Sequence, residues 1–278
     1  MAGNLFDKTV CLSVTFRIPS NMRRGDLSRV STDSQRSELV LRKRIFHSPI
    51  MAKIDLLAAR TRRWLRMLAL PCPLSRGTYL IPRSMLNDVE KRLDEVTDEF
   101  NELADQFVNE YPALIEQWRE KLGSQFNPSD YLSVEEVRQC FSVNRFFVDF
   151  RLPSEIDQNN EIESAINEIK LALREGLLEL VQKLADMLGD DKKCRVNSRT
   201  IERFQQWLEL LPKRNVLDDT ELRELAEQAK SLMAGKSAED LRDYEAVRNQ
   251  VREGMRRIAN KLQESIEQLP VRRFVLED

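Results

Sequence analysis

His47 is the only histidine in this chain of 278 residues. Histidine is the usual general base and metal ligand near neutral pH, but a catalytic triad or a facial metal site needs further partners beside it. His47 instead lies in a basic stretch without helical periodicity, next to Phe46 and the pair Ser48-Pro49. We therefore expect a surface or loop histidine with no chemical role, and we identify no catalytic residue.

The tripeptide Gly235-Lys236-Ser237 imitates the end of a phosphate-binding P-loop. The motif requires an earlier glycine and a preceding strand, whereas this chain has Lys230 at the glycine position and a helical pattern before it. We expect Gly235 to end one helix and Ser237 to cap the next, with Glu239 and Asp240 in its first turn.

Two further groups of residues could bind metal. The carboxylates Asp94-Glu95 and Asp98-Glu99 repeat at helical spacing, but a di-iron site would also need Glu-x-x-His motifs, so a solvated acidic face is expected. The cysteines Cys11, Cys72, Cys140 and Cys194 lack the close spacing of a zinc site or redox pair, and we expect them to be reduced and buried. The sequence thus predicts neither a metal nor a cofactor.

The basic residues are the strongest candidates for a binding site. Residues 21–66 contain twelve Lys and Arg and four Asp and Glu, whereas residues 86–122 contain four Lys and Arg and eleven Asp and Glu. Two alternatives stay open: the two segments neutralise each other within the fold, or the basic one contacts nucleic acid or an acidic partner. The candidate binding residues are Arg42, Lys43, Arg44, Arg60, Arg62, Arg63 and Arg66.

The composition favours long solvated helices as the elements that carry these residues. Charged residues make up 32% of the chain, while only 8 Gly and 10 Pro are present to interrupt helices. No run of about 18 uncharged apolar residues could cross a membrane, and the N-terminus lacks a secretion signal. We expect a cytoplasmic protein that does not bind membranes.

A small β element is predicted from three short stretches. Residues 9–18 are rich in β-branched side chains, and their end, VTFRIPS (14–20), returns as VDFRLPS at 148–154. Residues 77–81 form a third run. We expect two or three strands of one sheet, and a loop or mobile arm over residues 21–49.

The clearest pattern in the chain is a heptad seam on a helix expected from about Ser84 to Leu122, with a bend at Pro112. Apolar residues recur there at alternating spacings of 3 and 4: Leu86, Val89, Leu93, Val96, Phe100, Leu103 and Phe107. An intramolecular hairpin and a dimer use the same pattern, so the sequence leaves open whether the seam closes within one chain or between two.

Shorter helices are expected at 51–68, where Trp64 joins the apolar arc opposite the arginines, and at 133–140. A second long helix at about 166–187 is the expected partner of the first, and helices at 198–211, 218–233 and 237–269 follow. The predicted fold is mainly α, an elongated antiparallel helical bundle or coiled-coil hairpin with a small β element. Residues 1–160 and 161–278 would form its two halves within one elongated domain.

Three strings, LFDKTVCLSVTFRIPS (5–20), GTYLIP (77–82) and FFVDFRLPS (146–154), resemble an uncharacterised family of bacterial phage and mobile-element proteins. Members of that family are often encoded beside a MoxR-like or CobS-like AAA+ ATPase. The resemblance implies an accessory protein that binds or regulates such an ATPase in a phage or anti-phage setting. It supplies no catalytic residues.

Two functional hypotheses follow from these observations. The leading one is a non-enzymatic interaction or scaffold protein that docks a protein partner, an AAA+ ATPase or a second copy of itself, through its long helices. The alternative is a nucleic-acid-binding protein that uses residues 21–66. A hydrolase or nuclease ranks last, because no set of acidic residues can be nominated for it.

Overall fold

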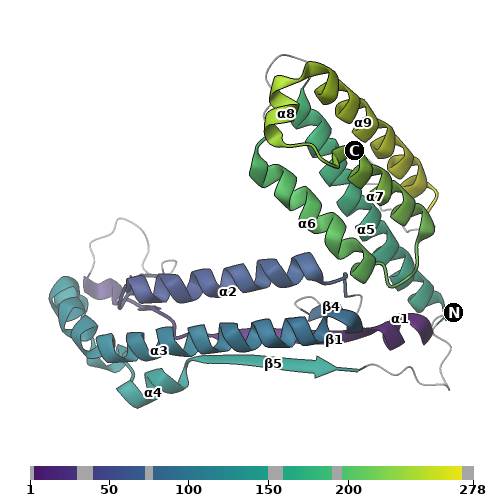
Figure 1. The fold of residues 1–278 in the computed structure, drawn as a ribbon. Helices are drawn as coiled ribbons and strands as arrows, with labels where there is room; N and C mark the ends of the chain where they lie inside the picture. The colour runs from purple at the N-terminus through teal and green to yellow at the C-terminus, as the bar shows by residue number, and fades with distance from the viewer. Residues whose placement is uncertain (1–2, 30–39, 73–77, 150–158, 190–195, 271–278) are drawn as a thin grey trace. The chain divides into compact units, whose positions relative to one another are not determined.

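The computed structural model describes residues 3–29, 40–72, 78–149, 159–189 and 196–270 (Figure 1). In these ranges it contains nine α-helices, one three-stranded sheet and one two-stranded sheet. The predicted class, mainly α with a small β element, is therefore confirmed.

The elements have the following bounds. The helices are α1 (Gly3–Lys8), α2 (Pro49–Leu68), α3 (Leu86–Leu122), α4 (Val134–Gln139), α5 (Asn159–Leu188), α6 (Ser198–Arg214), α7 (Thr220–Met233), α8 (Ala238–Asp243) and α9 (Glu245–Glu267). The strands are β1 (Thr9–Arg17), β2 (Met22–Arg24), β3 (Arg42–Arg44), β4 (Thr78–Pro82) and β5 (Ser142–Val148). Short 3-10 turns include η4 (Gly123–Gln125) and η5 (Pro128–Asp130).

The chain divides into two compact units. Unit 1 comprises residues 1–12, 65–86 and 147–278, and unit 2 comprises residues 13–64 and 87–146. These units differ from the expected halves, residues 1–160 and 161–278, because segments from the first third of the chain belong to unit 1.

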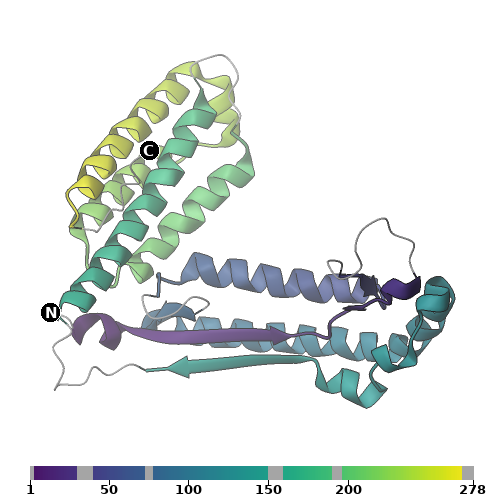
Figure 2. The same ribbon diagram turned by 180° about the vertical axis from the view of Figure 1, so that it is seen from behind.

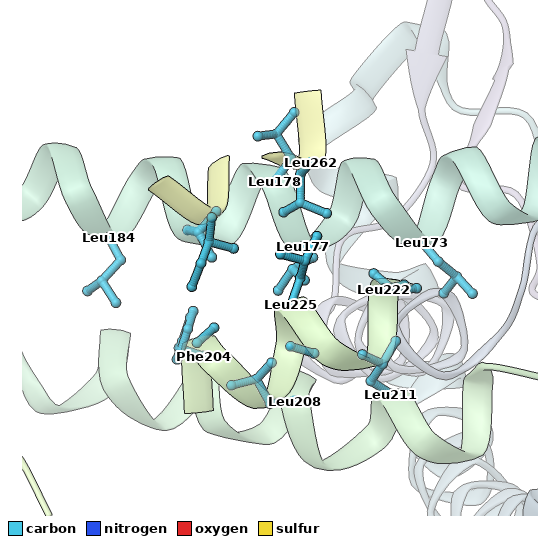
Figure 3. Packing of buried hydrophobic residues seen from close by; sticks show 14 of the residues in the cluster. Leu173, Leu177, Leu178, Leu184, Phe204, Leu208, Leu211, Leu222, Leu225 and Leu262 are labelled. Carbon is cyan, nitrogen blue, oxygen red and sulfur yellow. The ribbon is translucent and has the colours of Figure 1, made fainter. Parts of the chain in front are cut away.

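The core of unit 1 is a set of leucine-rich helices (Figure 3). Leu173, Leu177 and Leu184 of α5 are at most 1% exposed. They belong to one cluster with apolar side chains of α6, α7 and α9, and Leu5, Cys11, Leu70 and Leu80 from the N-terminal segments join it. Burial of these side chains is the main source of stability for the unit.

The helix that packs along α5 is α9, which runs antiparallel to it (Figures 1 and 2). The prediction that α5 pairs with α3 in a coiled-coil hairpin is wrong. A heptad pattern shows that a helix has an apolar stripe but does not identify the element that covers it. The stripe of α5 is covered by C-terminal helices of its own unit.

The predicted seam on α3 lies in the core of unit 2. Val89, Leu93, Val96, Phe100 and Phe107 are at most 2% exposed, whereas Leu86 and Leu103 are half-buried. Aromatic rings from other segments cover this seam. Phe16 of β1 lies 5.8 Å from Phe100, and Phe46 and Phe141 lie 5.3 and 5.6 Å from Phe107, measured between ring centroids. The seam therefore closes within one chain.

The three-stranded sheet has the order β4-β1-β5, and β1 and β5 run side by side in opposite directions (Figure 2). The prediction that strands near residues 9–18 and 77–81 share a sheet is confirmed. The strand near the VDFRLPS string comes earlier than predicted, because β5 ends at Val148 where that string begins. Residues 150–154 of the string lie outside the described residues.

Most of the predicted helix ends agree with those in the structure. Ser133 with Glu136 and Ser237 with Asp240 form capping boxes, and α3 continues through Pro112 to Leu122, changing direction toward its C-terminal end (Figure 1). Two details differ. Pro212 does not end α6, and the helix predicted at 237–269 is split at Tyr244, which is 61% exposed.

Candidate functional site

A two-stranded ribbon occupies part of the segment that was predicted to be a loop or mobile arm. β2 pairs antiparallel with β3, in the register Met22↔Arg44, Arg23↔Lys43 and Arg24↔Arg42. Backbone hydrogen bonds extend the ribbon at both ends, from Gly25 to Leu41 (2.8 Å) and from Ile45 to Asn21 (2.9 Å). The loop prediction for residues 21–49 is thus wrong for this part, and residues 30–39 lie outside the described residues.

The outer face of the ribbon carries three arginines. Because side chains alternate along a strand, Met22, Arg24, Arg42 and Arg44 share one face, and all four are exposed. The guanidinium-bearing residues Arg24 and Arg42 stand directly opposite each other. Like charges at directly opposed positions destabilise a strand pair, so this face would gain stability from an anion.

A cleft of about 490 Å³ adjoins this face. It is lined by Ser20, Met22, Arg23, Arg24, Val40 and Arg42. Its apolar members Met22 and Val40 are 38% and 70% exposed, and no aromatic ring is among the described residues that line it. The cleft therefore offers cations and aliphatic surface but no stacking platform.

Lys43, one of the predicted binding residues, makes contacts within the chain. Its side chain, 10% exposed, points to the inner face of the ribbon. Its Nζ lies 2.6 Å from a carboxylate oxygen of Asp130 on η5 and donates to the carbonyl oxygen of Gln125 at 2.6 Å. Asp26 and Gln125 exchange two more hydrogen bonds, of 3.0 and 3.1 Å. These contacts fasten the ribbon to η4 and η5.

The α2 arginines Arg60, Arg62, Arg63 and Arg66 are exposed, on the side of the helix opposite its buried face. The apolar arc predicted for α2 is buried except for Trp64, which is half-buried. Arg62 is engaged within the chain, because its guanidinium lies 5.3 Å from the centre of the Phe16 ring. Arg60 and Arg63 are thus the α2 residues best placed to add to a basic surface.

Acidic side chains of α3 pair with arginines on neighbouring elements. Asp94 accepts a hydrogen bond from Arg145 of β5 at 2.5 Å, and Asp105 accepts one from Arg138 of α4. Within the described residues, the candidate Lys43 forms an ion pair with Asp130. Arg24, Arg42 and Arg44 have no carboxylate partner in that part of the chain.

The other sequence candidates do not assemble into a site. His47 is exposed, Gly235 has a positive φ of 69°, and Ser237 caps α8 as expected. The described residues contain no group of three or more His, Cys, Asp or Glu side chains that could hold a metal ion. Within the same ranges, no helix is long and apolar enough to span a membrane.

Two groups of interacting residues were not predicted from the sequence. Arg174 of α5, which is 8% exposed, makes two hydrogen bonds to the Asp219 carboxylate (2.9 and 3.1 Å) and one to the carbonyl of Ser265 (2.9 Å). Cys11 and Cys72 place their sulfur atoms 3.5 Å apart. No local spacing could reveal either, because the partners are 45 and 61 residues apart. Cys140 is reduced and half-buried, and Cys194 lies outside the described residues.

Comparison with known proteins identifies a family but no activity. The family described as "Protein of unknown function (DUF3150)" matches residues 22–211, which is more than half of the chain, and the chain belongs to this family. The match includes the ribbon, α2 and α3. No curated protein and no solved structure matches the chain.

Proposed function

We propose that this member of the DUF3150 family is a non-enzymatic binding protein, and that the outer face of the β2–β3 ribbon binds the phosphate backbone of double-stranded nucleic acid. The single observation that carries the proposal is the directly opposed pair Arg24↔Arg42, with Arg44 on the same exposed face. A row of guanidinium groups that has no carboxylate partner among the described residues is suited to bridging phosphate oxygens.

The arrangement favours duplex over single-stranded nucleic acid. Proteins that bind single strands combine cations with aromatic side chains on which bases stack. The described residues that line the cleft beside the ribbon include no aromatic side chain. Cations alone provide backbone contacts with little sequence preference. Arg60 and Arg63 on the exposed side of α2 would extend the same kind of contact.

The scaffold hypothesis loses the surface that motivated it. Docking through the α3 heptad requires accessible seam side chains, and Val89, Leu93 and Phe100 are covered by their own chain. An AAA+ ATPase partner rests on the family resemblance alone. We therefore treat an acidic protein surface as the competing ligand in the test below.

The test is the salt dependence of binding to a fluorescein-labelled duplex, followed by fluorescence anisotropy. The wild-type chain should lose affinity steeply as salt rises, because each phosphate contact releases counterions and adds about 0.9 to the slope of log K against log salt. The double variant Arg24→Glu with Arg42→Glu should bind at least about tenfold more weakly at low salt, with a flatter slope.

A matched control separates the ribbon from net charge. Arg199→Glu with Arg203→Glu makes the same charge change at two exposed positions on α6 in unit 1, and it should leave duplex binding almost unchanged. Equal losses in the two double variants, or no duplex binding by the wild type, would refute the proposal. Tighter binding to labelled polyglutamate than to the duplex, lost in the ribbon variant, would instead identify an acidic protein surface.

A further inference from the structure

We propose that Cys11 and Cys72 form a thiol-oxidation site, which a hydroperoxide converts into a disulfide within the chain. The inference is independent of the proposed binding function, because both cysteines belong to unit 1 and neither lies on the basic ribbon. It rests on the position of the two sulfur atoms, on the backbone that holds them and on their unequal exposure.

The sulfur atoms are already close to bonding distance. The Cys11 and Cys72 Sγ atoms lie 3.5 Å apart, and both residues are reduced. A disulfide bond measures about 2.0 Å, so small side-chain movements would bring the atoms together. In the part of the chain that the structure describes, no third ligand stands beside them to make a metal site.

The backbone holds both residues in place. Cys11 lies on β1, the central strand of the three-stranded sheet, and β4 is its neighbour. The segment that leads to Cys72 is fixed to β4 by the bridge Leu70↔Leu80, in which the Leu70 N–H donates to the Leu80 carbonyl at 2.8 Å. In the sequence Cys72 stands between Pro71 and Pro73, which restricts its own backbone. The pair is therefore preorganised.

The two sulfurs differ in their access to solvent. Cys11 is 4% exposed, whereas Cys72 is half-buried. While Cys72 is reduced, the hydrogen bond with Cys72, together with burial and the charge of the neighbouring sulfur, raises the pKa of the Cys11 thiol, so Cys11 is the poorer nucleophile toward the oxidant. Cys72 is thus the sulfur that an oxidant in solution meets first, and Cys11 is the resolving thiol.

The chemistry proceeds in two balanced steps. The Cys72 thiolate attacks the terminal oxygen of the hydroperoxide ROOH, the O–O bond breaks, and the sulfenic acid Cys72–SOH forms. The leaving alkoxide takes up a proton from water and departs as the alcohol ROH. The Cys11 sulfur then attacks the Cys72 sulfur, the S–S bond forms, and the hydroxyl leaves as water with the Cys11 proton. The two thiols are oxidised by two electrons and the peroxide is reduced.

The experiment uses the wild-type chain and hydrogen peroxide as the probe. After brief oxidation and alkylation of the remaining thiols, peptide mass spectrometry should find the peptides of Cys11 and Cys72 linked, with a mass about 2 Da below the sum of the reduced peptides. A thiol reductant should reverse the linkage. We expect the pair to oxidise about tenfold faster than Cys140, because the resolving thiol is held in position.

Variants test the order of the two steps. In Cys11→Ser the Cys72 sulfenic acid should persist and react with dimedone, whereas in Cys72→Ser the buried Cys11 should resist oxidation. Cys140→Ser is the control and should leave the linked peptide unchanged. The proposal fails if wild-type Cys11 and Cys72 stay unlinked while Cys140 is oxidised, or if Cys72 links mainly to another cysteine. The wild-type measurement decides the question even if a variant does not fold.

Discussion

At the scale of single residues, the buried ion pair Arg174–Asp219 links three helices of unit 1. Arg174 joins α5 to the N-terminus of α7 and to α9 through Asp219 and the Ser265 carbonyl. Asp219 is also the N-cap of α7, since its carboxylate accepts from the Leu222 amide at 3.1 Å. Breaking a buried ion pair costs more than a surface pair, because it leaves one charge without its partner.

Asp219→Asn should therefore lower the free energy of unfolding by about 3 kcal/mol at pH 7. Asparagine caps helices about as well as aspartate, so the loss would report the ion pair and not the cap. Glu221, 3.0 Å from Arg174, limits the loss by keeping one carboxylate near the guanidinium. Urea unfolding followed by circular dichroism measures the difference, and Glu221→Gln, at an exposed position, should cost less than about 1 kcal/mol.

The same pair predicts an acid-dependent stability. Burial raises the pKa of Asp219, but hydrogen bonds from Arg174 and the Leu222 amide and the charge of Arg174 outweigh it, so the folded pKa lies below the usual 3.8. The contribution of the pair is then fully present above about pH 4 to 5 and is lost as the pH falls through the lowered pKa. The stability gap between wild type and Asp219→Asn should shrink between pH 5 and about pH 2, and a gap that is constant with pH would contradict this account.

At the scale of elements, α3 shows how a heptad seam can be an intramolecular core. Phe107 is fully buried, and the rings of Phe46, Phe141 and Tyr111 lie 5.3 to 5.7 Å from it. Phe107→Ala should cost about 3–5 kcal/mol, because it leaves a cavity among these rings. Leu103→Ala, at a half-buried position of the same seam, should cost clearly less.

Protein concentration separates this core from a dimer interface. A seam that closes within one chain gives the same unfolding midpoint at about 1 μM and about 100 μM protein. The midpoint of an obligate dimer rises with protein concentration, because mass action favours the folded dimer. A concentration-dependent midpoint that Phe107→Ala abolishes would contradict the intramolecular seam.

Local pattern predicted the elements well but not their partners. The heptad of α3, the apolar arc of α2 and the capping box at Ser133 are fixed by residues within one or two helical turns, and the structure has all three. The ribbon was missed because three-residue strands carry almost no periodicity. The inward turn of Lys43 depends on Asp130, which is 87 residues away in the sequence.

At the scale of the whole molecule, the two units are assembled from segments that alternate along the chain. Unit 1 takes its residues from three separate stretches, so its boundaries depend on long-range contacts that neither composition nor periodicity encodes. The thiol pair Cys11–Cys72 is a consequence of this assembly, since it arises where the first and second of those stretches meet.

Two units with separate aliphatic and aromatic cores should unfold in two steps. Leu177 is fully buried among the helices of unit 1, and Phe107 is fully buried in unit 2. Leu177→Ala should remove about 2–5 kcal/mol from unit 1 and lower one calorimetric transition, while Phe107→Ala lowers the other. The elements that have residues in both units oppose this separation: β1, α2, α3 and β5. A single transition that both variants lower equally would mean that these shared elements make the chain one cooperative folding unit.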